Sequence, residues 1–190
     1  MMQSHSLEAD MLSRTLSVTD SGLPFVERAM ALNPNLATAW LLSGWLRAFR
    51  GDSDVAIEHF EHAMRLSPLD PELFRMRAGM GFAHLLAGRF DDASSWAEKA
   101  FYDLTTFLPA VSIIAASNAL AGRMEQARRA MEHLHQLDPA LRVDNLTNWF
   151  PLRSMNLAGN WAKNSPPRGF GEMVRRITKS GVTRIERHTL

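Results

Sequence analysis

Three stretches of this sequence end in the same way, and no other feature restricts the possible folds as strongly. They are 29–34 (AMALNP), 63–68 (AMRLSP) and 134–139 (LHQLDP), and the first two prolines are 34 residues apart. Proline cannot continue the hydrogen-bond ladder of a helix, so each stretch predicts the end of a helix. A fixed period of this length predicts stacked copies of one helical unit, each too small to bury its apolar face alone.

A second marker, a glycine followed five residues later by an alanine, recurs with a similar spacing. It occurs at Gly51/Ala56, Gly88/Ala93 and Gly122/Ala127. Glycine readily adopts the left-handed conformation that ends many helices, so each glycine predicts a tight turn between two helices. We expect Asp52, Asp91 and Asp92 to cap the helices that follow, by accepting free backbone N–H groups.

Residues 24–139 resemble tandem tetratricopeptide repeats (TPRs). The resemblance is carried in the first full repeat by Trp40, Gly44, Ala56, Phe60, Ala63 and Pro68. It divides this region into a half repeat at 24–34 and three full repeats at 37–70, 71–107 and 108–139. Two further segments, 1–23 and 140–190, flank the repeats. It implies an all-α fold, an α-solenoid of antiparallel helix pairs in a right-handed superhelix. We expect the N-terminal segment to be poorly ordered and the C-terminal one to form a cap with a basic tail.

The second and third repeats depart from the TPR pattern. Gly81 takes the small helix-packing position of the second repeat, where we expect three extra residues to lengthen the first helix by almost a turn. Ala115 replaces this glycine in the third repeat. The tyrosine that is frequent in the family is replaced by Arg47, His84 and Asn118. The fold prediction does not depend on these positions.

The repeats are also similar to the C-terminal repeat region of bacterial multidomain regulators. This likeness rests on runs such as AIEHFEHAMRLSPLDP at 56–71 and GMGFAHLLAGRFDDASSWAEKA at 79–100. In those regulators the repeats follow a class III adenylate cyclase domain or a winged-helix DNA-binding domain. Neither domain is found in this sequence, so the likeness implies a detached sensory or oligomerisation module of such a cyclase or transcriptional regulator.

The TPR register places the first helix of each repeat on the inner, concave face, where TPR proteins bind their partners. We expect the partner-binding site to consist of Leu41, Trp45, Phe49, Arg75, Phe82, Leu85 and Leu86. This set lacks the lysine and asparagine with which some TPR proteins clamp a carboxylate. It predicts binding of an amphipathic helix or apolar peptide by aromatic anchors. The alternative is that residues 140–163, or a second copy in a homo-oligomer, cover this face.

The sequence argues against catalysis and bound cofactors. It has no cysteine, which excludes disulfides and thiolate metal ligands, and it has no P-loop, GxGxxG or nucleophile elbow. His59 and His62 occur in the order EHFEH rather than HExxH, so we expect a solvated helix face there and not a metal site. We therefore expect no enzyme activity, no cofactor and no metal.

Charge is distributed unevenly along the chain. Residues 151–190 contain eight basic and two acidic residues, against 13 and 18 in residues 1–150. The basic segment has no recognised nucleic-acid motif, so we expect a cap or tail attracted to the acidic body and no nucleic-acid binding. The sequence has neither a secretory signal nor an apolar run of about 18 residues. We therefore expect a cytoplasmic protein with a protein or peptide partner and no membrane contact.

Overall fold

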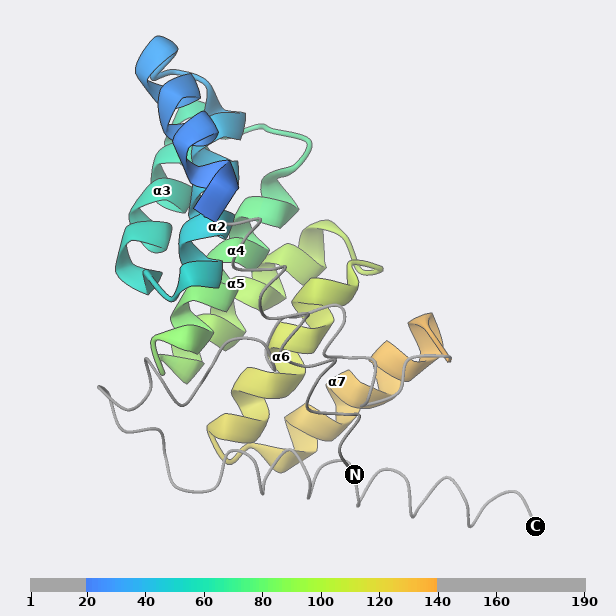
Figure 1. The fold of residues 1–190 in the computed structure, drawn as a ribbon. Helices are drawn as coiled ribbons and strands as arrows, with labels where there is room; N and C mark the ends of the chain where they lie inside the picture. The colour runs from blue at the N-terminus through green and yellow to red at the C-terminus, as the bar shows by residue number, and fades with distance from the viewer. Residues whose placement is uncertain (1–19, 140–190) are drawn as a thin grey trace, which may run out of the picture.

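The computed structural model describes residues 20–139, and every regular element in this part of the chain is an α-helix (Figure 1). A first helix covers residues 20–32, followed by α2 (Ala37–Arg50), α3 (Ser53–Leu66), α4 (Leu73–Leu86), α5 (Phe90–Asp103), α6 (Leu108–Leu120) and α7 (Met124–Leu137). Residues 20–23, which we grouped with the N-terminal segment, belong to the first helix. The expectations for residues 1–19 and 140–190 lie outside the described residues.

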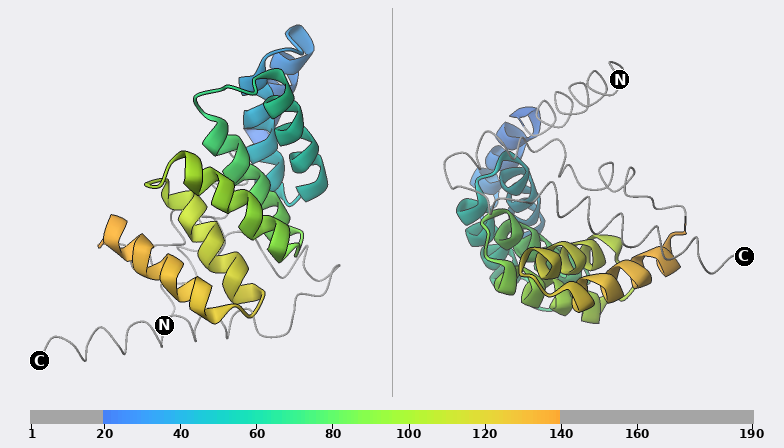
Figure 2. Two further views of the ribbon diagram at one scale, coloured as in Figure 1. Left: turned by 180° about the vertical axis from the view of Figure 1, so that it is seen from behind. Right: turned by 90° about the horizontal axis from the view of Figure 1, so that it is seen from below.

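The helices form a curved stack of antiparallel pairs. Each helix from α2 to α6 packs on the next one in the chain, and α4 also contacts α2 and α6. The helices α2, α4 and α6 therefore form one layer, and α3, α5 and α7 form the other. Seen from below in Figure 2, the described chain follows an arc from its first helix to α7. This arrangement confirms the predicted all-α solenoid of helix pairs.

Glycine turns the chain between the two helices of each repeat, as predicted. The φ angles of Gly51, Gly88 and Gly122 are 87°, 76° and 79°, in the left-handed region where a side chain is strained. In each turn, the N–H group after the glycine bonds to the carbonyl five residues earlier. These bonds are Asp52 to Arg47 (3.0 Å), Arg89 to His84 (2.9 Å) and Arg123 to Asn118 (2.8 Å). Arg47, His84 and Asn118, which replace the tyrosine frequent in TPRs, are thus each linked by a backbone hydrogen bond to the residue after the glycine.

The ring of Phe60 fills the space between the first two repeats. A Cβ atom added to Gly44 would lie 2.7 Å from this ring, and one added to Gly79 would lie 2.3 Å from it. Phe60 is completely buried. Glycine at these two positions therefore lets α2 and α4 approach α3 closely. Gly81, at the predicted helix-packing position of the second repeat, instead faces Ala93 and Ala97 of α5.

The expected lengthening of the first helix in the second repeat is wrong. α4 has 14 residues, the same number as α2. The extra residues lie in the connections: the segment before α4 is 67–72, whereas the segments before α2 and α6 are the shorter 33–36 and 104–107. Two prolines, Pro68 and Pro71, fall in this longer segment, where the absence of an N–H group breaks no helical hydrogen bond.

The capping role expected for three aspartates is also wrong. Asp52 is the N-cap residue of α3, and Asp91 and Asp92 lie in the first turn of α5, yet neither helix start has a side-chain capping hydrogen bond. The carboxylates contact basic side chains instead: Asp52 Oδ2 lies 3.6 Å from Arg47, and Asp92 Oδ2 lies 3.9 Å from His84 Nδ1. The favourable position near the positive end of the helix dipole is kept, but the direct contacts are with side chains.

Candidate functional site

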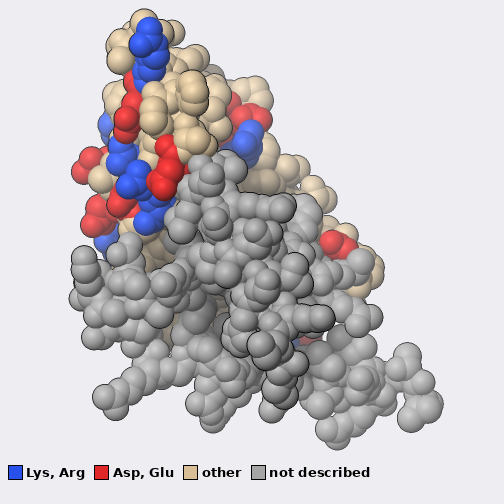
Figure 3. All heavy atoms as spheres, viewed as in Figure 1, with Lys and Arg blue, Asp and Glu red and all other residues tan. Residues whose placement is uncertain are grey.

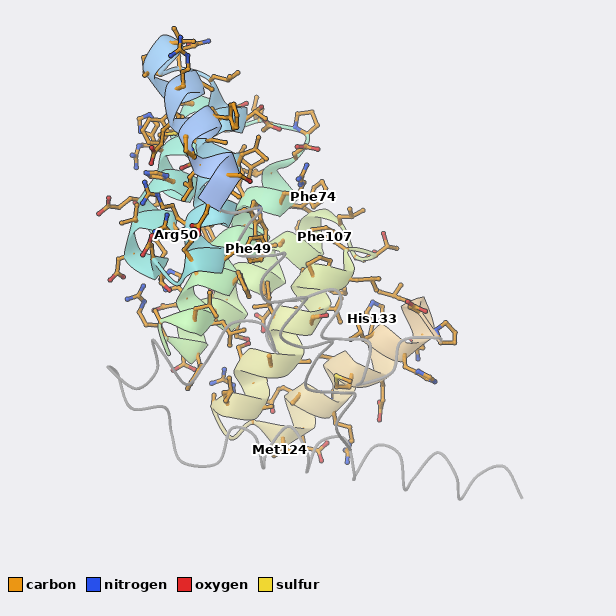
Figure 4. The ribbon with its side chains drawn as sticks, viewed as in Figure 1. Phe49, Arg50, Phe74, Phe107, Met124 and His133 are labelled. Atoms are coloured by element: carbon orange, nitrogen blue, oxygen red, sulfur yellow. The ribbon has the colours of Figure 1, made fainter. Side chains whose placement is uncertain are left out.

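A cluster of four aromatic rings lies at the predicted inner face, three from the inner layer and one from the layer behind it. Trp45 in α2 stacks on Phe82 in α4, with 5.9 Å between the ring centres and 28° between the planes. Phe49, one turn after Trp45, lies 5.8 Å from Trp45 and 5.7 Å from Phe82, and Figure 4 shows it between α2 and α4. The edge of Phe60 approaches Trp45 from the other layer at 5.6 Å. The structure thus brings three of the predicted site residues, Trp45, Phe49 and Phe82, into direct contact.

The predicted site residues differ in how much of their surface is accessible. Leu41, Phe82 and Leu85 are buried, with exposed fractions of 1%, 0% and 4%. Trp45, Phe49 and Leu86 are only partly buried. A partner on this face would therefore meet Trp45, Phe49 and Leu86 directly, whereas Phe82 would act by supporting the two rings packed on it.

Arg75 is the one charged residue of the predicted set, and its charge is matched by Glu72, the N-cap residue just before its helix. Both carboxylate oxygens of Glu72 accept hydrogen bonds from its guanidinium, at 2.9 and 2.8 Å. The next basic residue of α4, Arg77, is bound to Asp103 of α5 at 2.6 Å. The basic side chains of this part of α4 are therefore directed to carboxylates rather than left for an acidic ligand.

The third helix of the inner layer, α6, contains no charged residue (LPAVSIIAASNAL). Its hydroxyl groups are turned to its own backbone, since Ser112 Oγ donates to the Leu108 carbonyl at 2.9 Å and Ser117 Oγ to the Ile113 carbonyl at 2.7 Å. Within residues 20–139, neither α6 nor any other helix is both long and apolar enough to span a membrane. Ala110, Val111, Ile113, Ala115 and Ala119 of α6 are buried, so much of its apolar surface belongs to the core.

A set of side-chain bridges that the sequence did not lead us to expect joins successive repeats. Arg89 donates from Nε to His84 Nδ1 and from a terminal nitrogen to Asp54 of the preceding repeat, both at 2.9 Å. Arg123 repeats this arrangement one repeat later, because it donates to Asn118 Oδ1 at 2.6 Å and also to Asp91. We call these the Arg89 bridge and the Arg123 bridge.

The first repeat is joined to the helix before it by a different set of ion pairs. Arg47 is bound to Glu27 at 2.6 Å, and Arg50 lies 3.6 Å from Asp20. Figure 3 shows Lys and Arg side chains interleaved with Asp and Glu along this side of the described surface. The repeated Leu-Ala-Gly-Arg at 86–89 and 120–123, with Asp54 and Asp91 37 residues apart, was the signal that could have indicated the bridges.

The two histidines considered as metal ligands pack against a tryptophan. The ring of Trp40 lies 5.0 Å from His59 and 4.1 Å from His62, and its indole N–H donates to the Pro34 carbonyl at 2.8 Å. A shallow hollow of about 460 Å³ lies here, lined by Trp40, Glu58, His59, Glu61, His62 and Arg65. Within residues 20–139, no three His, Asp or Glu side chains are placed to hold one metal ion.

Two histidines have perturbed acid–base properties. Burial lowers the pKa of His59 from its usual 6.5, and the charge of Arg47 lowers it further. Burial also lowers the pKa of His84, with Arg89 adding to the effect and Asp92 opposing it. Both rings have polar neighbours: His59 Nδ1 lies 2.9 Å from Ser43 Oγ, and His84 Nδ1 accepts the Arg89 hydrogen bond. The two histidines are therefore favoured in their neutral forms near pH 7.

The helices form an all-α repeat solenoid with a TPR-like fold, and comparison with solved structures supports this fold. One similar structure is MamA, with 17% identity and a TM-score of 0.60 over 92% of this chain and 93% of that one. Another MamA structure has 23% identity and a TM-score of 0.54 over 65% of this chain and 69% of that one. A third is YrrB, described as a TPR protein with an unusual peptide-binding site, with 16% identity and a TM-score of 0.54 over 88% of each chain.

These likenesses establish the fold. No protein-family model and no curated protein matches the sequence. The likeness to the repeats of cyclases and winged-helix regulators gains no support from these comparisons and stays a prediction.

Proposed function

We propose that this chain is a non-enzymatic interaction module that binds an amphipathic helix or apolar peptide on the face formed by α2, α4 and α6. The observation that carries the proposal is the partly exposed pair Trp45 and Phe49, held on the buried ring of Phe82. Rigid aromatic side chains at the centre of a contact surface are the usual anchors of protein interfaces. The pairing of Arg75 with Glu72 and the uncharged sequence of α6 favour an apolar ligand.

The similar structures add a general argument. YrrB is described as a TPR protein with a peptide-binding site, so a solenoid of this shape is able to present a peptide site. The residues that form the site in the present chain are proposed from its own geometry, because the two sequences are only 16% identical.

A peptide selection with a matched pair of variants tests the proposal. Peptides from a random helix library would be selected on the unmodified protein, and their affinity would then be measured for Phe49→Glu and Tyr102→Glu. Phe49 lies on the proposed face, whereas Tyr102 of α5 is 87% exposed in the other layer. Both changes add the same charge, and circular dichroism would confirm that both variants are folded.

We expect the selected peptides to be amphipathic and apolar on one side. Their affinity should fall at least about tenfold with Phe49→Glu, because the carboxylate would lose hydration against an apolar ligand, and it should be unchanged with Tyr102→Glu. Equal binding to both variants, or a selection that yields only polar peptides, would refute the proposal. If light scattering shows a dimer that Phe49→Glu dissociates, the alternative of a self-covered face would replace it.

A further inference from the structure

The Arg89 bridge contains a titratable acceptor whose protonation state is determined by its donor. Arginine remains protonated at all physiological pH values, so its Nε–H group can only donate. The hydrogen bond of 2.9 Å from Arg89 Nε to His84 Nδ1 therefore requires Nδ1 to carry a lone pair. His84 is consequently neutral in this arrangement, with its proton on Nε2.

The charged groups around His84 come from three parts of the structure. Arg89 precedes α5 and lowers the pKa of the ring, whereas Asp92 of α5 and Asp54 and Glu61 of α3 raise it. Burial is the largest influence and also lowers the pKa, in agreement with a side chain that is only 13% exposed. The neutral form, and with it the Arg89 bridge, is thus stable at neutral pH.

Protonation of Nδ1 is incompatible with the bridge. The new N–H group would point at the Arg89 N–H group, so that two donors and two positive charges would face each other. Asp92 offers an alternative partner, because its Oδ2 already lies 3.9 Å from His84 Nδ1. A protonated His84 would turn to Asp92, and Arg89, which also reaches Asp54 on α3, would lose one of its two anchors.

The next repeat provides an internal comparison in which the acceptor cannot titrate. Asn118 is equivalent to His84, Arg123 to Arg89 and Asp91 to Asp54. Arg123 donates to Asn118 Oδ1 at 2.6 Å and also to Asp91. An amide oxygen does not titrate and accepts a hydrogen bond at both neutral and mildly acidic pH. The Arg123 bridge therefore has no acid-sensitive member apart from its exposed carboxylate.

We propose that His84 is an acid-sensitive latch on the joint between the first and second full repeats, whereas the equivalent Arg123 bridge of the next joint contains no histidine and does not respond to mild acid. Uptake of one proton by His84 releases the Arg89 Nε–H group and loosens the connection to Asp54. The curvature of the solenoid depends on how neighbouring repeats pack, so the latch links mild acidification to the shape of the inner face.

Pairs of spin labels across the two joints test this directly, since the chain has no native cysteine. Glu58, Ser95 and Arg129 are exposed and occupy equivalent positions on α3, α5 and α7. Labels at Glu58→Cys and Ser95→Cys report the first joint, and labels at Ser95→Cys and Arg129→Cys report the second. Distance distributions would be recorded for the full chain between about pH 8 and about pH 5, with circular dichroism at each pH.

We expect the first joint to show a wider or displaced distance distribution in acid, with a midpoint below the usual histidine pKa. The second joint is measured with His133→Gln, because His133 of α7 contacts the Phe101 ring and the Thr105 carbonyl of the preceding repeat, and it should stay unchanged. His84→Asn should abolish the response of the first joint, because it installs the acceptor found in the next repeat. Asn118→His should give the second joint a response of its own. An unchanged first joint, an equal response of both joints, or a response that persists in His84→Asn would overturn the proposal. If His84→Asn does not fold, the response of the Asn118→His variant decides the question.

Discussion

The ring of Phe82 lies stacked against that of Trp45, with 5.9 Å between their centres, and none of Phe82 is exposed. The two residues belong to consecutive helices of the inner layer, so this contact joins two repeats. It also separates two roles within the proposed face: Phe82 holds the aromatic cluster in place, whereas Trp45 and Phe49 present surface to a partner.

Truncation of Phe82 should therefore affect stability first. We expect Phe82→Ala to lower the free energy of unfolding by about 3–5 kcal/mol, as for other large-to-alanine changes in a protein core. Tyr102→Ala, at a position that is 87% exposed, should change it by less than about 0.5 kcal/mol. Urea unfolding followed by circular dichroism measures both, and similar losses for the two variants would contradict the packing described here.

Alanine at Gly44 should also destabilise the protein. Its Cβ would lie 2.7 Å from the Phe60 ring, which is buried and is also in close contact with Gly79. Overpacking of this kind costs about 1–3 kcal/mol. Gly22→Ala is the matched control, because its Cβ would meet Leu46 at an ordinary 3.4 Å and alanine favours helix by about 0.5–1 kcal/mol. We expect Gly44→Ala to lower the midpoint temperature of thermal unfolding and Gly22→Ala to leave it unchanged or raise it. A higher midpoint for Gly44→Ala would contradict the packing of Phe60 against Gly44.

The Arg123 bridge should be asymmetric in its energetics. Arg123→Met removes a donor from the buried side chain of Asn118, and an unsatisfied buried acceptor costs about 1–3 kcal/mol. Asp91→Asn removes only an ion pair whose carboxylate is 88% exposed, which is worth at most about 1 kcal/mol. Chemical unfolding of both variants provides the comparison. A larger loss for Asp91→Asn would mean that the ion pair, and not the contact with Asn118, holds the turn.

Stability should decrease as the pH is lowered, and His59 should contribute to the decrease. The pKa of His59 is below 6.5 in the folded protein, so below that pH the unfolded chain binds more protons than the folded chain. The free energy of unfolding is therefore fully maintained above pH 6.5 and falls as the pH drops toward the lower pKa of the folded state. Urea midpoints across this range should show a shallower decrease in His59→Gln. The same decrease in both proteins would argue against a perturbed His59.

Much of the fold follows from local signals in the sequence. Gly51, Gly88 and Gly122 mark the three turns because a left-handed residue is required there, and the recurring prolines mark the ends of repeats. Gly44 and Phe60 are two of the residues that carry the TPR resemblance in the first repeat, so close packing of its two helices was also within reach.

The candidate site was less accessible to sequence reasoning, since it depends on how the repeats stack. The register placed Trp45 and Phe82 on the same face but did not indicate that one would bury the other. The partner of Arg89, Asp54, is 35 residues earlier in the chain. The sequence pattern near Asp91 indicated a helix cap, because its partner Arg123 belongs to the next repeat.

The most direct test of the proposed binding face uses the indole N–H signals of the protein in NMR spectra. Trp45 lies in the aromatic cluster of the inner layer, whereas Trp96 of α5 packs beneath Lys99, whose ammonium lies 4.0 Å from its ring. Addition of a selected apolar helical peptide should shift or broaden the Trp45 indole signal and leave the Trp96 signal in place. A peptide that binds while the Trp45 signal stays unchanged would show that the ligand is held elsewhere, and the account of the inner face would be wrong.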